Sequence, residues 1–258
     1  MALPYVEMPR AGDGMISPFG AIVLAGVTLG GLAMVGTARR YAIATGEALG
    51  LAGVLVLVGL IGAHVFDVLC YQRGEPGVWL RVLSGISLYG ALIAVSATTA
   101  IWAQARRIEL AGLADCVALG VLVAVVVGRI GCALVHDHPG VPTELPIGVD
   151  FPNRVVAWLG LHGAGGTVRL HDCGLEELVA LLPLGAIAWT LWRRRLRPGV
   201  VAVVIALGYA ALRFALDFLR LPATEPSHAG LTAGQWASVA MAAVAAFAAT
   251  TLTAADRS

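Results

Sequence analysis

Long apolar runs separated by short polar connections dominate the hydrophobic pattern of this chain. A helix needs about 20 consecutive apolar residues to cross the hydrocarbon core of a bilayer, and seven runs approach that length. They lie near Ser17–Thr37, Ala48–Cys70, Ser84–Ala103, Leu113–Val135, Leu175–Trp192, Val200–Phe218 and Thr232–Thr253. The pattern predicts an all-α, polytopic membrane protein of about seven transmembrane helices that forms a single transmembrane domain over residues 1–258.

The long connection between the fourth and fifth runs, residues 136–174, is too polar and too broken to be another span. It is interrupted by Pro139, Pro142, Pro146, Pro152 and the glycine-rich stretch Gly163–Gly166. Apolar side chains such as Phe151 and Trp158 are interleaved with the polar ones, which favours a segment that lies on the membrane surface. We expect this segment to be an extracytoplasmic loop.

Arginines gather in alternate connections between the apolar runs. The clusters are Arg39 and Arg40, Arg106 and Arg107, the group Arg193, Arg194, Arg195 and Arg197, and Arg257 after the last run. Cytoplasmic connections of membrane proteins carry an excess of positive charge, so we expect these connections to be cytoplasmic. The N-terminus and residues 136–174 are then outside, and the C-terminus is in the cytoplasm.

A set of unusual polar residues in and beside the apolar runs falls at the opposite end from those arginine clusters. They are His64, Asp67, Ser87, Tyr89, the stretch from Arg129 to Asp137, His171, Glu177, Arg213, Asp217 and Arg220. Alternation of the spans alone places them on one side of the membrane, whichever side that is. Because polar groups within a bilayer are costly, their convergence predicts a single site facing the outer leaflet.

Composition narrows the classes of protein that fit this pattern. The chain is 59% hydrophobic and only 13% charged, with a mean hydropathy of +0.84 and a net charge of +1. Such a composition indicates an integral protein of the lipid bilayer and argues against nucleic acid as a partner. All 17 basic residues are arginine, so Schiff-base chemistry on lysine is excluded, and no cofactor motif is present.

Two arginines carry the candidate chemistry. Arg129 lies in the last turn of the fourth span, where a guanidinium is costly without a partner or a task. Tyr209, Arg213 and Asp217 follow at intervals of four and form one polar stripe about 12 Å long, with Arg220 near the same face. The stripe is either a structural ion pair or, together with Arg129, a site for a lipid phosphate.

Histidines and acids near these arginines supply further candidates. Asp137 and Glu177 would balance the charge of a phosphate site. His136 and His138 flank Asp137 but are too close in sequence for helical zinc-ligand spacing, and no HExxH motif is present, so the sequence predicts no metal site. A histidine beside a phosphate-binding arginine can instead accept a proton from a thiol, whereas His138 is expected to lie in a solvated loop.

Several segments resemble prolipoprotein diacylglyceryl transferases, which are bacterial inner-membrane enzymes with seven spans. The stretch Gly128-Arg129-Ile130-Gly131 resembles the signature core of that family, with Cys132 where the family has asparagine, Asp137 in place of glutamate and Gly140 in register. The sixth run resembles the family pattern at Tyr209, Arg213, Phe214, Asp217, Phe218 and Arg220, and the fifth at His171, Leu175 and Glu177.

One departure from the family concerns the catalytic base. The segment Ser87-Leu88-Tyr89-Gly90-Ala91 is similar to the family's Ser-Phe-His-Gly-Gly, so Tyr89 stands where the family's proposed basic histidine lies. The base in this chain would then be His136 or His171, or the phosphate itself would accept the proton.

The resemblance implies transfer of the diacylglyceryl group of phosphatidylglycerol to the lipobox cysteine thiol of a prolipoprotein, at the outer leaflet of the bacterial cytoplasmic (inner) membrane. The expected partners are phosphatidylglycerol, a prolipoprotein signal peptide and the bilayer. The expected catalytic residues are Arg129, Arg213, His136, His171 and Asp137. The expected substrate-binding residues are Tyr89, Gly131, Cys132, Gly140, Glu177, Tyr209, Asp217 and Arg220.

Two alternatives remain open from the sequence. A divergent paralogue would keep the lipid-phosphate site but act on another acceptor or catalyse nothing. A channel or transporter would need polar residues through the inner leaflet, and the first, fifth and seventh runs contain almost none.

Overall fold

The computed structural model describes residues 3–7, 18–72, 77–80, 87–225 and 227–254. Within these residues, seven helices are long and apolar enough to cross a membrane, which confirms the predicted fold. They are α1 (Pro18–Ala38), α2 (Thr45–Cys70), α3 (Leu88–Arg106), α4 (Leu110–Val135), α6 (Cys173–Arg193), α7 (Val200–Leu216) and α8 (Ala233–Ala254). The predicted starts at Ser17 and Ser84, and Arg257, lie outside the described residues.

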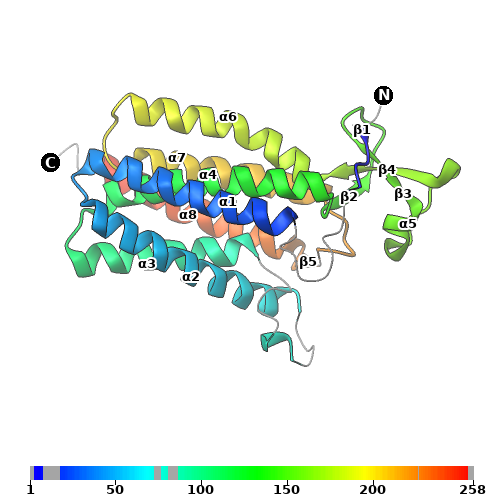
Figure 1. The fold of residues 1–258 in the computed structure, drawn as a ribbon, viewed down its shortest axis with the longest axis horizontal. Helices are drawn as coiled ribbons and strands as arrows, with labels where there is room; N and C mark the ends of the chain where they lie inside the picture. The colour runs from blue at the N-terminus through cyan, green and yellow to red at the C-terminus, as the bar shows by residue number, and fades with distance from the viewer. Residues whose placement is uncertain (1–2, 8–17, 73–76, 81–86, 226, 255–258) are drawn as a thin grey trace.

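The seven helices lie side by side along the long axis of the molecule (Figure 1). The connections α1–α2, α3–α4 and α6–α7, which carry the arginine clusters at 39–40, 106–107 and 193–197, meet at one end, which we call the arginine end. The connections α2–α3, α4–α6 and α7–α8 meet at the opposite end, which we call the head end. The alternation predicted from the sequence therefore sorts the two kinds of connection as expected.

Glycines allow the helix backbones to touch. A Cβ atom added to Gly30 of α1 would lie 2.5 Å from the carbonyl oxygen of Gly120 of α4, and one added to Gly90 of α3 would lie 2.1 Å from that of Gly62 of α2. Small residues at such crossings allow close packing, which supplies much of the attraction between helices in a membrane. The contact between Gly30 and Gly120 sets how closely α4, which carries Arg129, packs against α1.

A buried acid holds the start of α7 at the arginine end. Asp115 of α4 is fully buried and accepts hydrogen bonds from the Tyr41 hydroxyl at 2.7 Å, the Gly199 backbone N–H at 3.0 Å and the Ala202 backbone N–H at 2.7 Å. We call this group the Asp115 lock. It satisfies backbone donors at a helix N-terminus that would otherwise lack partners.

Residues 136–174, expected as a surface loop, fold into a small head with a sheet. Its four strands are ordered β1-β3-β4-β2, with β1 parallel to β3 and the other neighbours antiparallel. The strands are β1 (Leu3–Pro4), β2 (Pro139–Pro142), β3 (Val149–Pro152) and β4 (Thr167–Asp172), and the helix α5 (Asn153–Val156) follows β3. Val149, Phe151, Val156 and Leu170 form the core of this head.

Short elements complete the chain. A second sheet pairs β5 (Ser227–His228) with β6 (Leu231–Thr232) between α7 and α8. The 3-10 helices are η1 (Arg39–Tyr41), η2 (Val78–Leu80), η3 (Ala157–Leu159), η4 (Ala164–Gly166) and η5 (Asp217–Leu219). The head is tied to the bundle because the Cys173 N–H donates to the His138 carbonyl at 3.0 Å and Gly140 forms an isolated β-bridge with Arg220.

Candidate functional site

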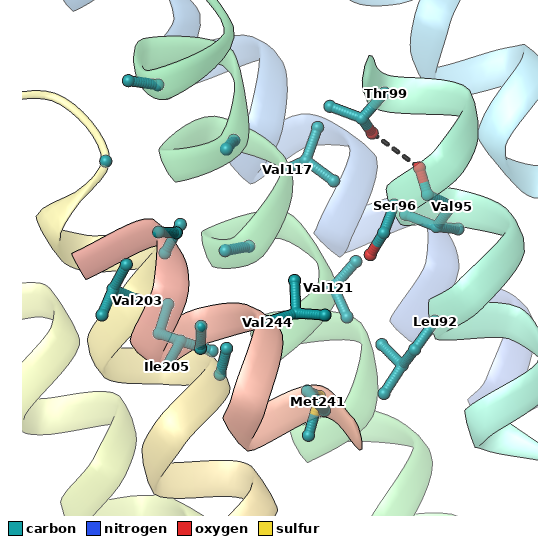
Figure 2. A pocket seen from close by; sticks show the side chains of 18 of the residues that line it. Leu92, Val95, Ser96, Thr99, Val117, Val121, Val203, Ile205, Met241 and Val244 are labelled. Atoms are coloured by element: carbon teal, nitrogen blue, oxygen red, sulfur yellow. Dashed lines mark hydrogen bonds between the residues drawn. The ribbon is translucent and has the colours of Figure 1, made fainter. Parts of the chain in front are cut away.

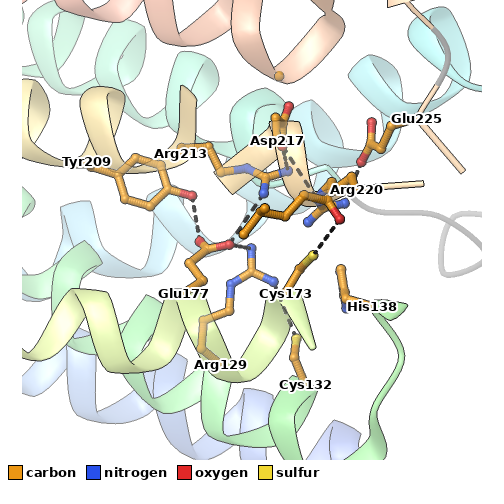
Figure 3. A network of polar contacts seen from close by, with 12 residues as sticks. Arg129, Cys132, His138, Cys173, Glu177, Tyr209, Arg213, Asp217, Arg220 and Glu225 are labelled. Carbon is orange, nitrogen blue, oxygen red and sulfur yellow. Dashed lines mark hydrogen bonds and ion pairs between the residues drawn. The ribbon is translucent and has the colours of Figure 1, made fainter. Parts of the chain in front are cut away.

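A buried glutamate joins three helices near the head end. Glu177 of α6 is fully buried, and its carboxylate accepts a hydrogen bond from the Tyr209 hydroxyl of α7 at 3.0 Å (Figure 3). It also forms ion pairs with Arg129 of α4, at 3.0 Å from Nη2, and with Arg213 of α7, at 3.6 Å from Nη1. The two intramembrane arginines that the sequence places in separate spans therefore share one carboxylate.

A second carboxylate extends this arrangement towards α8. Asp217 pairs with Arg213 one turn earlier, at 2.8 Å from Nη2, and with Arg220, at 3.4 Å from Nε. The Thr232 hydroxyl, just before α8, donates to Asp217. A Cβ atom at residue 234 would lie 2.5 Å from an Asp217 oxygen, so glycine at this position leaves room for the carboxylate.

Arg220 is paired in turn with Glu225, in the segment that follows η5. We call the six connected residues the arginine–carboxylate cluster. They are Arg129, Arg213, Arg220, Glu177, Asp217 and Glu225. The cluster contains equal numbers of guanidinium and carboxylate groups, so its net formal charge is zero.

Hydrogen bonding within the cluster is incomplete. Within the described part of the chain, Arg213 Nη1 and Arg220 Nε are buried nitrogens without a hydrogen-bond partner, and so are the carboxylate oxygens that face them, Glu177 Oε2 at 3.6 Å and Asp217 Oδ1 at 3.4 Å. Most buried polar groups in proteins have such a partner. Guanidinium N–H groups bind carboxylate and phosphate oxygens strongly, so these two donors are suited to an anionic ligand.

Two apolar cavities are each lined by one residue that contacts Glu177. One has a volume of about 410 Å³, lies among α1, α2, α3 and α4, and is lined by Arg129 and Cys132 as well as apolar residues such as Phe19 and Leu60. We call it the Arg129 cavity. The other, of about 510 Å³, lies among α3, α4, α7 and α8 and includes Tyr209 in its lining.

Figure 2 shows the second cavity, with the side chains of Leu92, Val121, Met241 and Val244 around it. Its wall is almost entirely apolar, and the Thr99 hydroxyl is hydrogen-bonded back to the Val95 carbonyl at 2.7 Å. Both cavities therefore combine an apolar wall with one residue that contacts Glu177. This combination suits a molecule with long hydrocarbon chains and one anionic group.

Tyr89, which the sequence predicts to bind substrate, lies beside the cluster without joining it. Its hydroxyl is hydrogen-bonded to Ser238 of α8, and its ring centroid is 6.2 Å from that of Tyr209. Tyr89 is buried, so its contact with α8 and Tyr209 packs three helices around the site. The structure shows no ion pair between Tyr89 and any described arginine.

The predicted basic histidines are each paired with an acid. His136 lies at the C-cap of α4, where its Nδ1 is 2.5 Å from an Asp172 oxygen and its Nε2 accepts from the Val6 backbone N–H at 3.3 Å. Both of its ring nitrogens are therefore engaged. His171 bonds Glu176 through Nδ1, and the structure shows no partner for its Nε2 among the described residues.

Asp137, predicted to be catalytic, lies outside the arginine–carboxylate cluster. Its half-exposed carboxylate is hydrogen-bonded to His138, and both lie close to Cys132. Cys132 Sγ is in turn 3.6 Å from Arg129 Nη1. Residues 128–140 therefore contribute to two neighbouring groups of polar side chains. Arg129 belongs to the arginine–carboxylate cluster, and Cys132, Asp137 and His138 lie next to it.

The two predicted substrate-binding glycines have packing roles that the structure makes clear. A Cβ atom on Gly131 would lie 3.1 Å from the Phe19 ring of α1, and one on Gly140 would lie 2.4 Å from the Leu219 carbonyl oxygen. Gly140 lies at the β-bridge to Arg220, so it allows the head to approach the cluster.

Glu225 and Tyr71 are members of the site that the sequence reasoning missed. Glu225 is buried and pairs with Arg220, and Tyr71, just after α2, lies close to Glu225. Burial, reinforced by the Glu225 charge, raises the pKa of Tyr71, which therefore stays a neutral donor. The available signal was an isolated acid in the short connection between two spans.

Comparisons with known proteins identify the family of this chain. The family model described as prolipoprotein diacylglyceryl transferase matches residues 10–251. The phosphatidylglycerol–prolipoprotein diacylglyceryl transferase of Roseobacter denitrificans is 34% identical over 179 residues, which cover 65% of this chain and 60% of that protein. The enzyme of the same name from Rhizobium meliloti is 31% identical over 193 residues, covering 74% of this chain and 65% of that protein.

A relative from Streptomyces coelicolor aligns along more of the chain. It is named phosphatidylglycerol–prolipoprotein diacylglyceryl transferase 2 and is 29% identical over 257 residues, covering 93% of this chain and 78% of that protein. The alignments with the two preceding relatives cover less than two thirds of the length of those proteins. Because the family model matches most of the seven-helix chain, this protein belongs to the prolipoprotein diacylglyceryl transferase family.

Proposed function

We propose that this protein transfers the diacylglyceryl group of phosphatidylglycerol to the lipobox cysteine thiol of a prolipoprotein and releases glycerol phosphate. The reaction would take place at the outer leaflet of a bacterial cytoplasmic membrane, with the N-terminus outside and the C-terminus in the cytoplasm. The observation that carries the proposal is the buried arginine–carboxylate cluster, in which Arg129 also lines an apolar cavity.

The site has the chemical character that a phospholipid needs. Arg213 and Arg220 would donate N–H hydrogen bonds to the phosphate oxygens, and Arg129 lines the cavity that would receive a hydrocarbon chain. The hydrocarbon chains of the phospholipid would lie against the apolar cavity wall. Its negatively charged phosphate would lie against the guanidinium groups. An anion without hydrocarbon would use only half of this site.

Charge on the leaving group is the main demand of the reaction. The acceptor sulfur forms a bond to the glyceryl carbon, the bond from that carbon to the phosphate oxygen breaks, and glycerol phosphate leaves with the electron pair. Arg129, Arg213 and Arg220 would stabilise that developing charge in a site with little water. Their side chains are 10%, 8% and 11% exposed, so their attraction for the charge is weakly screened.

The acceptor thiol must also lose a proton. Of the two histidines predicted as the base, His136 uses both ring nitrogens within the head, whereas His171 uses only Nδ1 in its contact with Glu176. His171 therefore fits the role of proton acceptor better than His136. Its Nε2 would take the thiol proton in this scheme.

The experiment is a transfer assay with the full-length protein in detergent or liposomes. Phosphatidylglycerol labelled in its diacylglyceryl group is incubated with a lipobox peptide, and a peptide with serine in place of the cysteine is the matched control. We expect label on the cysteine peptide alone. Absence of label, under conditions in which another family member transfers it, would refute the proposal.

A further inference from the structure

Three side chains at the end of α4 form a group that the arginine–carboxylate cluster does not use. Cys132 offers a thiol sulfur, Asp137 a carboxylate oxygen and His138 a ring nitrogen, and these atoms all lie within 4.8 Å of one another. Within the described part of the chain, this is the one group of three or more such side chains with that spacing. Figure 3 shows Cys132 beside Arg129 and His138 where the chain leaves the helix.

The backbone brings these side chains together. His136 ends α4 in the left-handed conformation, with φ of 51°, and so reverses the direction of the chain. The His138 carbonyl then accepts from the Cys173 N–H at 3.0 Å, which fixes the start of the head. Cys132 is buried, whereas the side chains of Asp137 and His138 are 37% and 26% exposed, so the group opens to the outside.

A thiol, a carboxylate and an imidazole are a ligand set typical of zinc. Zn²⁺ accepts sulfur, nitrogen and oxygen ligands, whereas Mg²⁺ and Ca²⁺ prefer oxygen alone. Three protein ligands leave one tetrahedral position open, as in catalytic zinc sites. Arg129 Nη1 is 3.6 Å from the Cys132 sulfur, but Glu177 balances that charge at 3.0 Å from Arg129 Nη2.

We propose that Cys132, Asp137 and His138 bind a zinc ion whose open position holds the acceptor cysteine of the substrate as a thiolate. This inference rests on the proposed function, and it departs from the sequence-based prediction of no metal site, which considered the histidines without Cys132. The thiol proton passes to water when the sulfur binds the metal, and this step takes the place of the proton transfer to His171 described above. The sulfur then bonds the glyceryl carbon, and glycerol phosphate leaves with the electron pair.

This arrangement links two departures from the family pattern. By the resemblance described from the sequence, Tyr89 stands where the family has the histidine proposed as base, and Cys132, on the neighbouring helix, stands where it has an asparagine. A metal ion that deprotonates the acceptor thiol removes the need for a base at residue 89. The ion would also lie near Arg129, and therefore close to the proposed phosphate site.

The first experiment measures metal binding by the full-length protein in detergent, after metal has been removed with a chelator. Co²⁺ replaces Zn²⁺ as a spectroscopic probe, because a thiolate–cobalt bond absorbs in the near ultraviolet. We expect one equivalent of Co²⁺ with this absorption, and displacement by Zn²⁺. Cys132→Ser should abolish the absorption, and His138→Ala and Asp137→Asn should weaken binding by about tenfold or more.

Matched controls separate ligand loss from misfolding. Cys173→Ser removes the other buried cysteine at this end, and His228→Ala removes an exposed loop histidine. Both should bind Co²⁺ as the wild type does, and all variants should unfold near the wild-type temperature. No cobalt binding by the wild type, or equal absorption in Cys132→Ser, would overturn the metal site.

The second experiment adds the lipobox peptide to the cobalt-loaded protein. The cysteine peptide should increase the thiolate–cobalt absorption, whereas the serine peptide should leave it unchanged. An unchanged spectrum with the cysteine peptide would overturn the role of the metal in holding the acceptor. If the protein binds metal and shows the spectral change but transfers no label, the metal site is supported and the proposed transferase activity is refuted. If metal-free protein transfers label, the role of the metal is refuted and the transferase activity stands.

Discussion

Two fully buried carboxylates lie towards opposite ends of the bundle and differ in the partners that compensate their charge. Asp115, at the arginine end, accepts hydrogen bonds from one side chain and two backbone N–H groups. Glu177, towards the head end, accepts one hydrogen bond from Tyr209 and otherwise depends on ion pairs with two arginines. Both are 0% exposed, so burial alone does not distinguish them.

The two sites differ in whether any buried polar atom is left without a hydrogen bond. The Asp115 lock matches donors to acceptors at the start of α7 and leaves nothing for a ligand. The arginine–carboxylate cluster keeps buried guanidinium N–H groups and carboxylate oxygens that lack hydrogen-bond partners among the described residues and are held by ion pairs alone. A buried polar group that is fully paired stabilises the fold, whereas one that is only partly paired is prepared for a further partner.

The largest expected effect is a loss of activity when the arginine–carboxylate cluster is changed. We expect Arg129→Ala to lower the rate of diacylglyceryl transfer by about 100-fold or more, because one preorganised donor to a developing anion is worth that much. The labelled-lipid assay, with equal amounts of folded protein, measures this loss. Arg129→Lys keeps the positive charge but loses the planar pair of donors, so its rate of transfer should lie between those of the wild type and Arg129→Ala. Wild-type activity in Arg129→Ala would refute the assignment of Arg129 to the active site.

The next effect is on stability, from a change at the Asp115 lock. Asp115→Ala leaves the Tyr41 hydroxyl and the Gly199 and Ala202 N–H groups without their acceptor, and we expect a loss of about 2–4 kcal/mol. Thermal unfolding in detergent would show it as a lower midpoint, with Asp115→Asn intermediate.

Activity sharpens that second prediction. Transfer per folded molecule of Asp115→Ala should stay within about twofold of the wild type, since hydrogen bonds of this kind contribute to stability rather than to the reacting groups. If transfer fell as far as in Arg129→Ala at unchanged stability, the distinction between the two ends would be wrong.

The smallest effect is expected at an exposed pair in the head. Arg169 on β4 donates to Asp150 on β3, with Nε 2.8 Å from Oδ1, and this hydrogen bond lowers the pKa of Asp150. The folded-state pKa is then below the unfolded value of about 3.9, so the pair stabilises above that pH and the stabilisation disappears as the pH falls through the folded value.

Exposure to water should make that contribution slight. We expect Asp150→Asn to shift the unfolding temperature by less than about 1 °C near neutral pH, with the shift vanishing in acid. Unfolding curves of both proteins between about pH 3 and pH 7 measure it. A shift comparable to that of Asp115→Ala would show that exposed pairs matter more here than buried ones.

Much of the architecture follows from the chain itself. Seven apolar runs of spanning length predict seven helices, and alternation of the connections predicts that polar residues gather at one end. The four-residue spacing of Arg213 and Asp217 predicts their ion pair, which the structure shows at 2.8 Å. These features depend on neighbours along one helix or on the length of a run, and a sequence records both directly.

Contacts between helices and within the head were decided by the tertiary structure. The sequence did not identify Glu177 as the shared partner of Arg129 and Arg213, the pairing of His136 with Asp172, or the sheet that residues 136–174 form with Leu3–Pro4. The approach of Cys132 to Asp137 and His138 also depends on the turn at His136. Helical periodicity fixes the face on which a side chain lies, whereas the rotation and depth of the neighbouring helix determine what that face meets.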